Sequence, residues 1–185
     1  MISLILDDAE TRMGKTVDSL RQELTRIRTG KANPALLDNI RISCYEQEMP
    51  LKQIASIAVP DPRQIVVQPW DKSILTDIEK AIQKADLGLN PNNDGSFIRI
   101  PIPPLTEERR KDLVKAVRKM AEDAKVALRN IRRDANEQLK ASEKDGEISE
   151  DESRRAQDKV QDLIDRKTSD LEGLLKRKEQ EIMEV

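Results

Sequence analysis

The residue types of this chain favour binding over catalysis. The 185 residues include no histidine, so a histidine general base and the usual zinc ligand sets are both excluded. Neither a glycine-rich phosphate loop nor a nucleophile elbow occurs, and the single cysteine, Cys44, has the setting of a strand residue. The abundant paired carboxylates belong to highly charged segments, where they normally form a solvated face. We therefore predict that the protein is not an enzyme and needs no metal or cofactor.

One cluster of basic residues has a spacing that suits a polyanion. It consists of four residues that lie three or four positions apart: Lys125, Arg129, Arg132 and Arg133. On a helix such residues project in neighbouring directions. At these spacings Arg129 and Arg132 have no acidic residue on their own helix, and Arg133 has only Glu137. Because the like-charge pairs would together cost about 1 kcal/mol, the cluster predicts a compensating partner.

Two kinds of partner fit this cluster equally well. One is the phosphate of RNA, and the other is an acidic row on another helix, such as Asp158, Asp162 and Asp165. Arginine binds both, and ion pairs at a protein surface are weak evidence for either. Aromatic residues make up only 2% of the chain, which argues against recognition of single-stranded bases by stacking.

The net charge of −2 conceals a local asymmetry. Residues 106–133 carry ten Lys or Arg against five Asp or Glu, whereas residues 134–185 carry ten against sixteen. A polyanion site must therefore be a confined patch. The single cysteine, the acidic start at Asp7 and Asp8 and the lack of a long apolar run predict a cytoplasmic protein that does not enter a membrane.

Three amphipathic helices are expected to present these side chains. Apolar residues recur every three or four positions over residues 2–28, and Gly30 is expected to end that helix. A second helix of about 38 residues begins after Thr106, a potential cap, and includes the basic cluster. A capping box of Ser149 and Glu152 begins a third helix. The pattern predicts an antiparallel three-helix bundle.

The pattern changes between residues 32 and 105. Short β-branched runs alternate there with turns, and all nine prolines of the chain fall in this region. One helix is expected from about Ser73 to Asp86. Trp70 follows a strand, and we expect it to be packed.

The two patterns together predict an α+β protein of two domains. Residues 1–29 and 105–185 form the bundle, and residues 30–104 form an inserted β/α/β domain. The chain crosses the junction twice, near residues 29–33 and 101–105. These crossings fit a hinge and a plain connection equally well. The candidate hinge residues are Thr29, Gly30, Lys31, Pro103 and Pro104.

Several longer strings of residues carry a family resemblance. They are Arg28-Thr-Gly-Lys-Ala-Asn-Pro34, Pro50-Leu51, Asp86-Leu-Gly-Leu-Asn-Pro91, Asp94-Gly95, Ile98-Arg-Ile-Pro-Ile-Pro-Pro-Leu-Thr-Glu-Glu-Arg-Arg-Lys111 and Arg129-Asn-Ile-Arg-Arg-Asp134. In this order, along essentially the whole chain, they resemble the ribosome recycling factor family. The resemblance implies an L-shaped molecule, similar in outline to transfer RNA.

The resemblance also implies a function. A protein of this kind binds the ribosome after termination and, with elongation factor G and GTP, promotes separation of the subunits and release from messenger RNA. Initiation factor 3 then acts on the released small subunit. The bundle would contact large-subunit ribosomal RNA through the arginine-rich stretch that matches Arg129, Arg132 and Arg133. Arg28 and Arg110 lie in other matching strings and are further candidates, and the inserted domain would face elongation factor G.

One departure from the family and one rival function remain. After Tyr45, where the family usually has glycine, this chain has Glu46, Gln47 and Glu48, which leaves the geometry of that turn open. The composition of the last two helices also fits a coiled-coil scaffold, or an RNA-binding protein without ribosome-splitting activity. A scaffold would self-associate. A recycling factor is expected to be a monomer, because its three apolar stripes satisfy one another within one chain.

Overall fold

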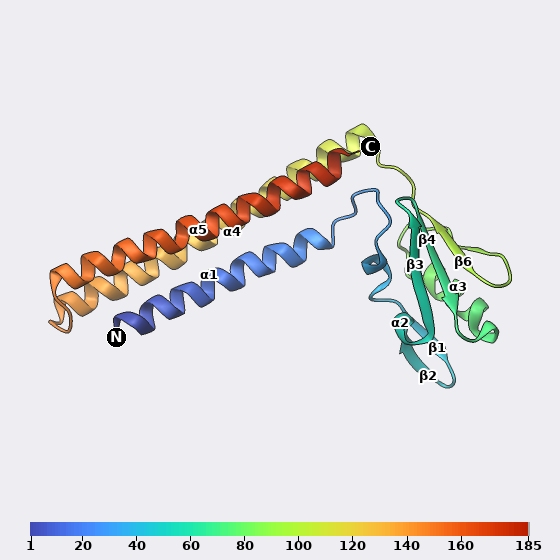
Figure 1. Cartoon of the computed structure of the whole chain (residues 1–185), viewed down its shortest axis with the longest axis horizontal. Coiled ribbons are helices and arrows are strands. Elements are labelled where there is room, and N and C mark those ends of the chain that lie inside the picture. Colours follow the sequence, from blue (N-terminus) through green and yellow to red (C-terminus); the bar gives the residue numbers. More distant parts are fainter. Residues whose placement is uncertain (185) are drawn as a thin grey trace. The chain divides into compact units, whose positions relative to one another are not determined.

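Three long helices form the first of the two compact units into which the chain divides. The structure, a computed structural model, describes residues 1–184, and this unit contains residues 1–27 and 107–184. Its helices are α1 (Ile2–Thr25), α4 (Glu107–Lys144) and α5 (Glu150–Met183). Each contacts the other two, and α4 runs antiparallel to α1 and α5 (Figure 1). The predicted three-helix bundle is confirmed.

The bundle core is aliphatic along its whole length. Its buried side chains recur at helical spacing, and the largest that are fully buried include Met13, Leu128, Leu139 and Leu171. Burying one such side chain stabilises the fold by roughly 1.5–3 kcal/mol. The continuous apolar stripe on α4 therefore fixes which face of that helix is available for charged residues.

The starts of the two long C-terminal helices match their sequence signals. Glu107 and Glu108 lie in the first turn of α4, where acidic side chains favour the helix dipole. At α5 the Ser149 hydroxyl accepts a hydrogen bond from the Glu152 amide at 3.1 Å, and the Ser149 amide donates to Glu152 Oε2 at 2.8 Å. The bond from the Ser149 backbone lowers the pKa of Glu152. The predicted capping box is confirmed.

The end of α1 differs from the prediction. The helix ends at Thr25 rather than beyond residue 28, and Arg26 is a right-handed C-cap. Gly30 has a left-handed φ of +77°, but it lies outside the helix terminus. A Cβ atom at Gly30 would lie 3.1 Å from Leu105 Cγ. The glycine therefore allows a close approach of the two connecting segments within the second unit.

The second unit, residues 28–106, contains two small antiparallel sheets and four short helical segments (Figure 1). The larger sheet has the order β3-β4-β6-β5, and the smaller is a hairpin of β1 and β2. The strands are β1 (Arg41–Cys44), β2 (Gln47–Pro50), β3 (Ala55–Asp61), β4 (Gln64–Pro69), β5 (Asn92–Asn93) and β6 (Ile98–Pro101). The helical segments are η1 (Pro34–Leu37), α2 (Leu51–Ile54), η2 (Lys72–Ile74) and α3 (Leu75–Lys84). The mixed helix and sheet content confirms the α+β prediction.

The core of the second unit follows the two-residue period of its strands. Ile65 and Val67 of β4 and Ile98 and Ile100 of β6 are fully buried, and Ile78 of α3 belongs to the same cluster. Alternate residues of a strand point to opposite faces, so these residues face α3 while their neighbours face outward.

Trp70 contradicts its predicted burial. Its residue surface is 69% exposed. The reason lies in the register of β4, because Ile65, Val67 and Pro69 are buried and the next residue therefore points the opposite way. The prediction of a packed tryptophan was wrong, although the alternation needed to correct it is present in the sequence.

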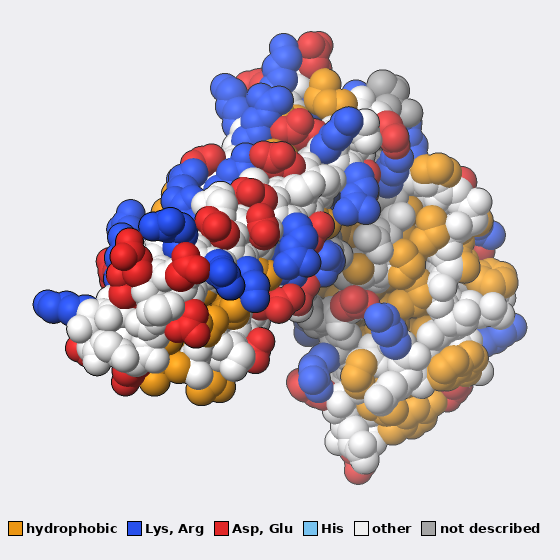
Figure 2. Space-filling view, turned by 60° about the vertical axis from the view of Figure 1, so that its left-hand side comes forward, with side chains coloured by type: hydrophobic (Ala, Val, Ile, Leu, Met, Phe, Trp, Pro, Cys, Tyr) orange, Lys and Arg blue, Asp and Glu red, His pale blue; other side chains and the backbone are white. Residues whose placement is uncertain are grey.

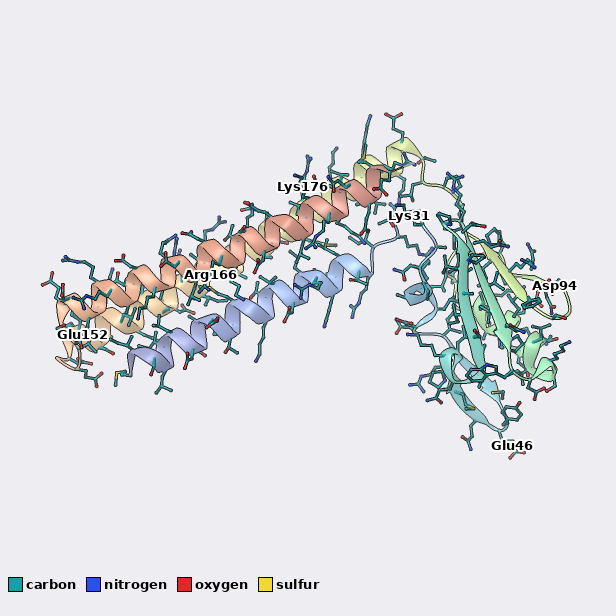
Figure 3. The ribbon with its side chains drawn as sticks, viewed as in Figure 1. Lys31, Glu46, Asp94, Glu152, Arg166 and Lys176 are labelled. Carbon is teal, nitrogen blue, oxygen red and sulfur yellow. The ribbon has the colours of Figure 1, made fainter. Side chains whose placement is uncertain are left out.

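The turn between β1 and β2 consists of Tyr45 and Glu46, at the tip of the hairpin (Figure 3). Both have positive φ angles, of 52° and 60°, as a type I′ turn requires. The Tyr45 hydroxyl donates a hydrogen bond to Asp71, which raises the pKa of Tyr45 and lowers the pKa of Asp71. The turn therefore forms without a glycine.

Both connecting segments are anchored to one turn of the second unit. The Ala32 amide donates to the Pro62 carbonyl at 2.6 Å, and the Ile102 amide donates to the Arg63 carbonyl at 2.7 Å. Pro62 and Arg63 form the turn between β3 and β4. These bonds hold the backbone at Ala32 and Ile102 against that turn.

The surfaces of the two units differ in character. Figure 2 shows charged side chains of both signs over the helices, and more extensive uncharged and hydrophobic surface over the sheet-containing unit. Within residues 1–184, no helix is both long enough and apolar enough to cross a membrane.

Candidate nucleic-acid interface

The candidate site is a basic row in the middle of α4. Its residues are Lys125, Arg129, Arg132 and Arg133. The row spans about 12 Å of the helix at 1.5 Å per residue. Leu128 and Ile131 are buried in the bundle, so the basic side chains emerge from the remaining faces, beside α5 or into solvent.

Two members of the row are paired with carboxylates. Lys125 Nζ lies 3.2 Å from Glu172 Oε1 of α5, and the Lys125 side chain is 27% exposed. Arg129 Nη2 lies 3.0 Å from Glu122 Oε1, two turns earlier on α4, with both side chains largely in solvent. An exposed pair such as Arg129–Glu122 contributes about 0–1 kcal/mol, so a phosphate competes with it at little cost.

The other two members have no carboxylate partner among the described residues. Arg132 is half-buried, and its Nη1 donates to the neutral Oε1 of Gln161 on α5 at 3.3 Å. Arg133 is exposed and makes no hydrogen bond or ion pair within residues 1–184. Their charges are therefore not neutralised by the protein.

The sequence left two partners open for the row, RNA phosphate and an acidic row on another helix. The structure decides only part of this question. Within residues 1–184, none of Asp158, Asp162 and Asp165 pairs with the row, and all three are exposed. The acids that do pair are Glu122 and Glu172. An internal acidic row therefore does not explain Arg132 and Arg133.

A different pairing occurs nearer the start of α4. Arg118 Nε donates to Glu179 Oε1 at 2.6 Å, and this hydrogen bond raises the pKa of Arg118. The bundle thus uses carboxylates to bind some of its arginines. The neutral or missing partners of Arg132 and Arg133 are a local property of the row.

The remaining predicted binding residues lie outside the row. Arg110 lies in the first turn of α4, fifteen residues before Lys125 or about 22 Å along the helix. Its Nε is buried and has no hydrogen-bond partner among the described residues. Arg28 belongs to the second unit, where its Nη1 would lie 3.6 Å from a Cβ at Gly88. Within the bundle, Arg110 therefore lies well away from the row.

The candidate hinge residues Thr29, Gly30, Lys31, Pro103 and Pro104 all belong to the second unit. Gly30 is the one with left-handed backbone geometry and the close approach to Leu105. Lys31, which is labelled in Figure 3, is exposed. A hinge role for this set stays a prediction.

Sequence reasoning missed the residues that surround the row. Glu122 is seven positions from Arg129, beyond the spacings of three and four that were considered. Glu172 and Gln161 come from α5, and the register of two antiparallel helices is needed to place them. Asn136, whose Oδ1 is buried and unpaired within residues 1–184, lies one turn beyond Arg132 and gave no signal except its polarity.

The chemistry available at this site is the binding of phosphate. A guanidinium presents five N–H donors in a planar fork that matches phosphate geometry, and two arginines here have no carboxylate partner within residues 1–184. No group of three or more potential metal ligands occurs within the described part of the chain. The helical bundle, the mixed helix and sheet unit and the partly unpaired basic row together define an α+β protein with a candidate phosphate-binding surface.

Comparison with known proteins gives the family. The family model for ribosome recycling factor matches residues 20–183. The ribosome-recycling factor of Halalkalibacterium halodurans is 56% identical over 181 residues, 98% of each chain, and that of Coxiella burnetii is 51% identical over the full length of both. The chain therefore belongs to the ribosome recycling factor family.

Two solved structures of this family resemble the chain over its whole length. A solution structure of the ribosome recycling factor has a TM-score of 0.80 and 41% identity, covering 100% of this chain and 98% of the other. The second comprises models for the T. thermophilus ribosome recycling factor and the E. coli elongation factor G bound to the E. coli post-termination complex. Its TM-score is 0.66 and its identity 47%, with both chains fully covered.

Proposed function

We propose that this protein binds the post-termination ribosome through large-subunit ribosomal RNA, with Arg129, Arg132 and Arg133 as the main contacts and Lys125 beside them. The observation that carries the proposal is the absence of a carboxylate partner for Arg132 and Arg133 within residues 1–184. Unneutralised arginines on a rigid helix attract phosphate and lose little freedom when they bind it. Arg28 and Arg110 are proposed as additional contacts.

The proposed outcome of binding is separation of the ribosomal subunits and release from messenger RNA. Elongation factor G supplies the GTP hydrolysis, and initiation factor 3 acts afterwards on the small subunit. This chain works as a cytoplasmic binding factor and catalyses no reaction itself. Support comes from the family, and from the relative that was placed with elongation factor G on a post-termination complex.

The two units would divide this work. The bundle binds ribosomal RNA, and the second unit faces elongation factor G, with a hinge at Thr29–Lys31 and Pro103–Pro104. The three apolar stripes pack against one another within one chain, which supports a monomer. Sedimentation of the purified protein tests this point, because a coiled-coil scaffold would sediment as a dimer or larger.

The substitution Arg132→Glu tests the RNA contact. Binding to purified large ribosomal subunits is measured over a salt series, together with the breakdown of polysomes by elongation factor G and GTP. We expect weaker binding, and a log–log salt slope that is flatter by at least about 0.7–0.9. Arg21→Glu, which makes the same charge change in an exposed residue already paired with Asp18 at 2.6 Å, is the control. Equal binding by Arg132→Glu and the wild type would exclude the role of Arg132.

A further inference from the structure

Gln161 occupies an unusual place beside the basic row. The other contacts between the row and neighbouring side chains end on carboxylates, those of Glu172 and Glu122. Gln161 instead offers Arg132 an uncharged oxygen, at 3.3 Å from Nη1. A glutamate at the same position would form an ion pair with Arg132 and neutralise it.

A second hydrogen bond, to Asp165, orients the Gln161 amide. Its Nε2 donates to Asp165 Oδ1, one turn further along α5, at 2.9 Å. A carboxylate accepts hydrogen bonds and a guanidinium only donates them. Asp165 therefore holds the amide nitrogen, and the amide oxygen must face Arg132. The three residues form a chain in which the negative charge is kept one side chain away from the arginine.

From this arrangement, we propose that Gln161 is a positioning residue for Arg132 in the binding of RNA phosphate. It restricts the rotamers of the guanidinium without cancelling its charge. One N–H of Arg132 is used by Gln161, and four of the five donors of an arginine then stay available for a phosphate. The inference rests on the proposed RNA contact of Arg132 and adds to it the residue that prepares this contact.

The surroundings of Arg132 agree with this role. Asn136 lies one helical turn beyond Arg132, and its buried Oδ1 has no partner within residues 1–184. It is another uncharged oxygen, one turn from Arg132 on the same helix. The Arg132 side chain is only partly exposed, and a half-buried charge is less screened by salt than an exposed one.

Three variants separate positioning from charge. Gln161→Met removes the acceptor and keeps the length of the side chain, whereas Gln161→Glu adds a carboxylate beside Arg132. Gln180→Glu makes the same charge change at an exposed position near the other end of α5. Each full-length variant is titrated against purified large ribosomal subunits at several salt concentrations, and thermal unfolding checks that the bundle is intact.

The two Gln161 variants should differ in how the affinity depends on salt. Gln161→Met should weaken binding about two- to tenfold, the cost of ordering one free side chain, and leave the salt slope unchanged. Gln161→Glu should weaken binding further and flatten the slope by up to about 0.7–0.9, because one unneutralised charge is lost. Gln180→Glu should bind as the wild type does.

A double-mutant cycle decides whether Gln161 acts through Arg132. In an Arg132→Ala background, Gln161→Met should have no further effect, since the residue it positions is absent. If Arg132→Ala weakens binding but Gln161→Met does not, or if their effects simply add, Gln161 is not a positioning residue. If Arg132→Ala binds as the wild type does, the proposed RNA contact itself fails.

Discussion

The substitution Glu46→Gly should stabilise the β1–β2 hairpin. Glu46 has a φ of 60° and follows Tyr45 at 52°, so two non-glycine residues occupy left-handed backbone geometry in one turn. Glycine adopts such angles without the clash between Cβ and the backbone that other residues suffer. Glu46 is exposed at the hairpin tip and makes no side-chain hydrogen bond within residues 1–184, so the substitution removes strain and no contact.

The size of the gain follows from two opposing effects. Left-handed geometry costs a non-glycine residue about 1–2 kcal/mol. Relief of this cost is offset by roughly 0.5–1 kcal/mol of destabilisation, because glycine makes the unfolded chain more flexible. We therefore expect the free energy of opening the hairpin to rise by about 0.5–1 kcal/mol, which slows hydrogen exchange of the β1 and β2 amides roughly two- to fivefold.

Native-state hydrogen exchange of these amides is the assay, and two substitutions serve as controls. Gln47→Gly lies next in the chain but within β2, at ordinary strand geometry, so it should destabilise the hairpin by about 0.5–1 kcal/mol. Glu46→Gln removes the charge and keeps the strain, and it should change stability by less than about 0.5 kcal/mol. If Glu46→Gly had the same effect as Gln47→Gly, the strain argument would be refuted.

Three further predictions concern titration and stability. The sole tyrosine, Tyr45, should ionise above the usual range in an absorbance titration, because its hydrogen bond to the Asp71 carboxylate raises its pKa. Asp71→Asn should return the pKa of Tyr45 toward 10.0. The stability that the raised pKa of Tyr45 contributes is present below the unfolded-state pKa of Tyr45 and is lost as pH rises through its folded-state pKa. Ser149→Ala removes the capping box of α5 and should cost about 0.5–2 kcal/mol in urea unfolding followed by circular dichroism. In the same assay Met13→Ala, at a fully buried site, should lower the free energy of unfolding by about 2–5 kcal/mol. Leu4→Ala, at a residue 72% exposed, should lower it by less than about 0.5 kcal/mol. Similar losses of stability from both substitutions would contradict the assigned core.

The long helices were predictable because their signals are local and repeated. The apolar period of three and four runs from Leu113 to Leu139 of α4, and the Ser149–Glu152 box marks the start of α5 within four residues. Such patterns act through neighbours on the same helix. The end of α1 was harder, because Gly30 suits both a helix terminus and a close approach to Leu105, and Leu105 is distant in sequence.

In the second unit, the predictions failed or stayed open where the environment of a residue depends on strand pairing and on which face of the strand it occupies. Trp70 was expected to be packed because it follows a strand, but the inward positions of β4 are taken by Ile65, Val67 and Pro69. The two-residue turn at Tyr45 and Glu46 was left open because the usual glycine is missing. Pairing of β1 with β2 imposes that turn, at a cost in backbone strain that no local preference predicts.

By itself, the sequence determined the helical bundle, the inserted mixed unit, the family resemblance and the basic row, because each depends on residue types at short spacing. The tertiary structure alone decided which charges of that row are neutralised. Lys125 meets Glu172, whereas Arg132 meets Gln161, and both contacts depend on how α4 and α5 align side by side. An ion pair between helices is set by distances of a few ångströms across the bundle, and those distances follow from core packing rather than from spacing along either helix.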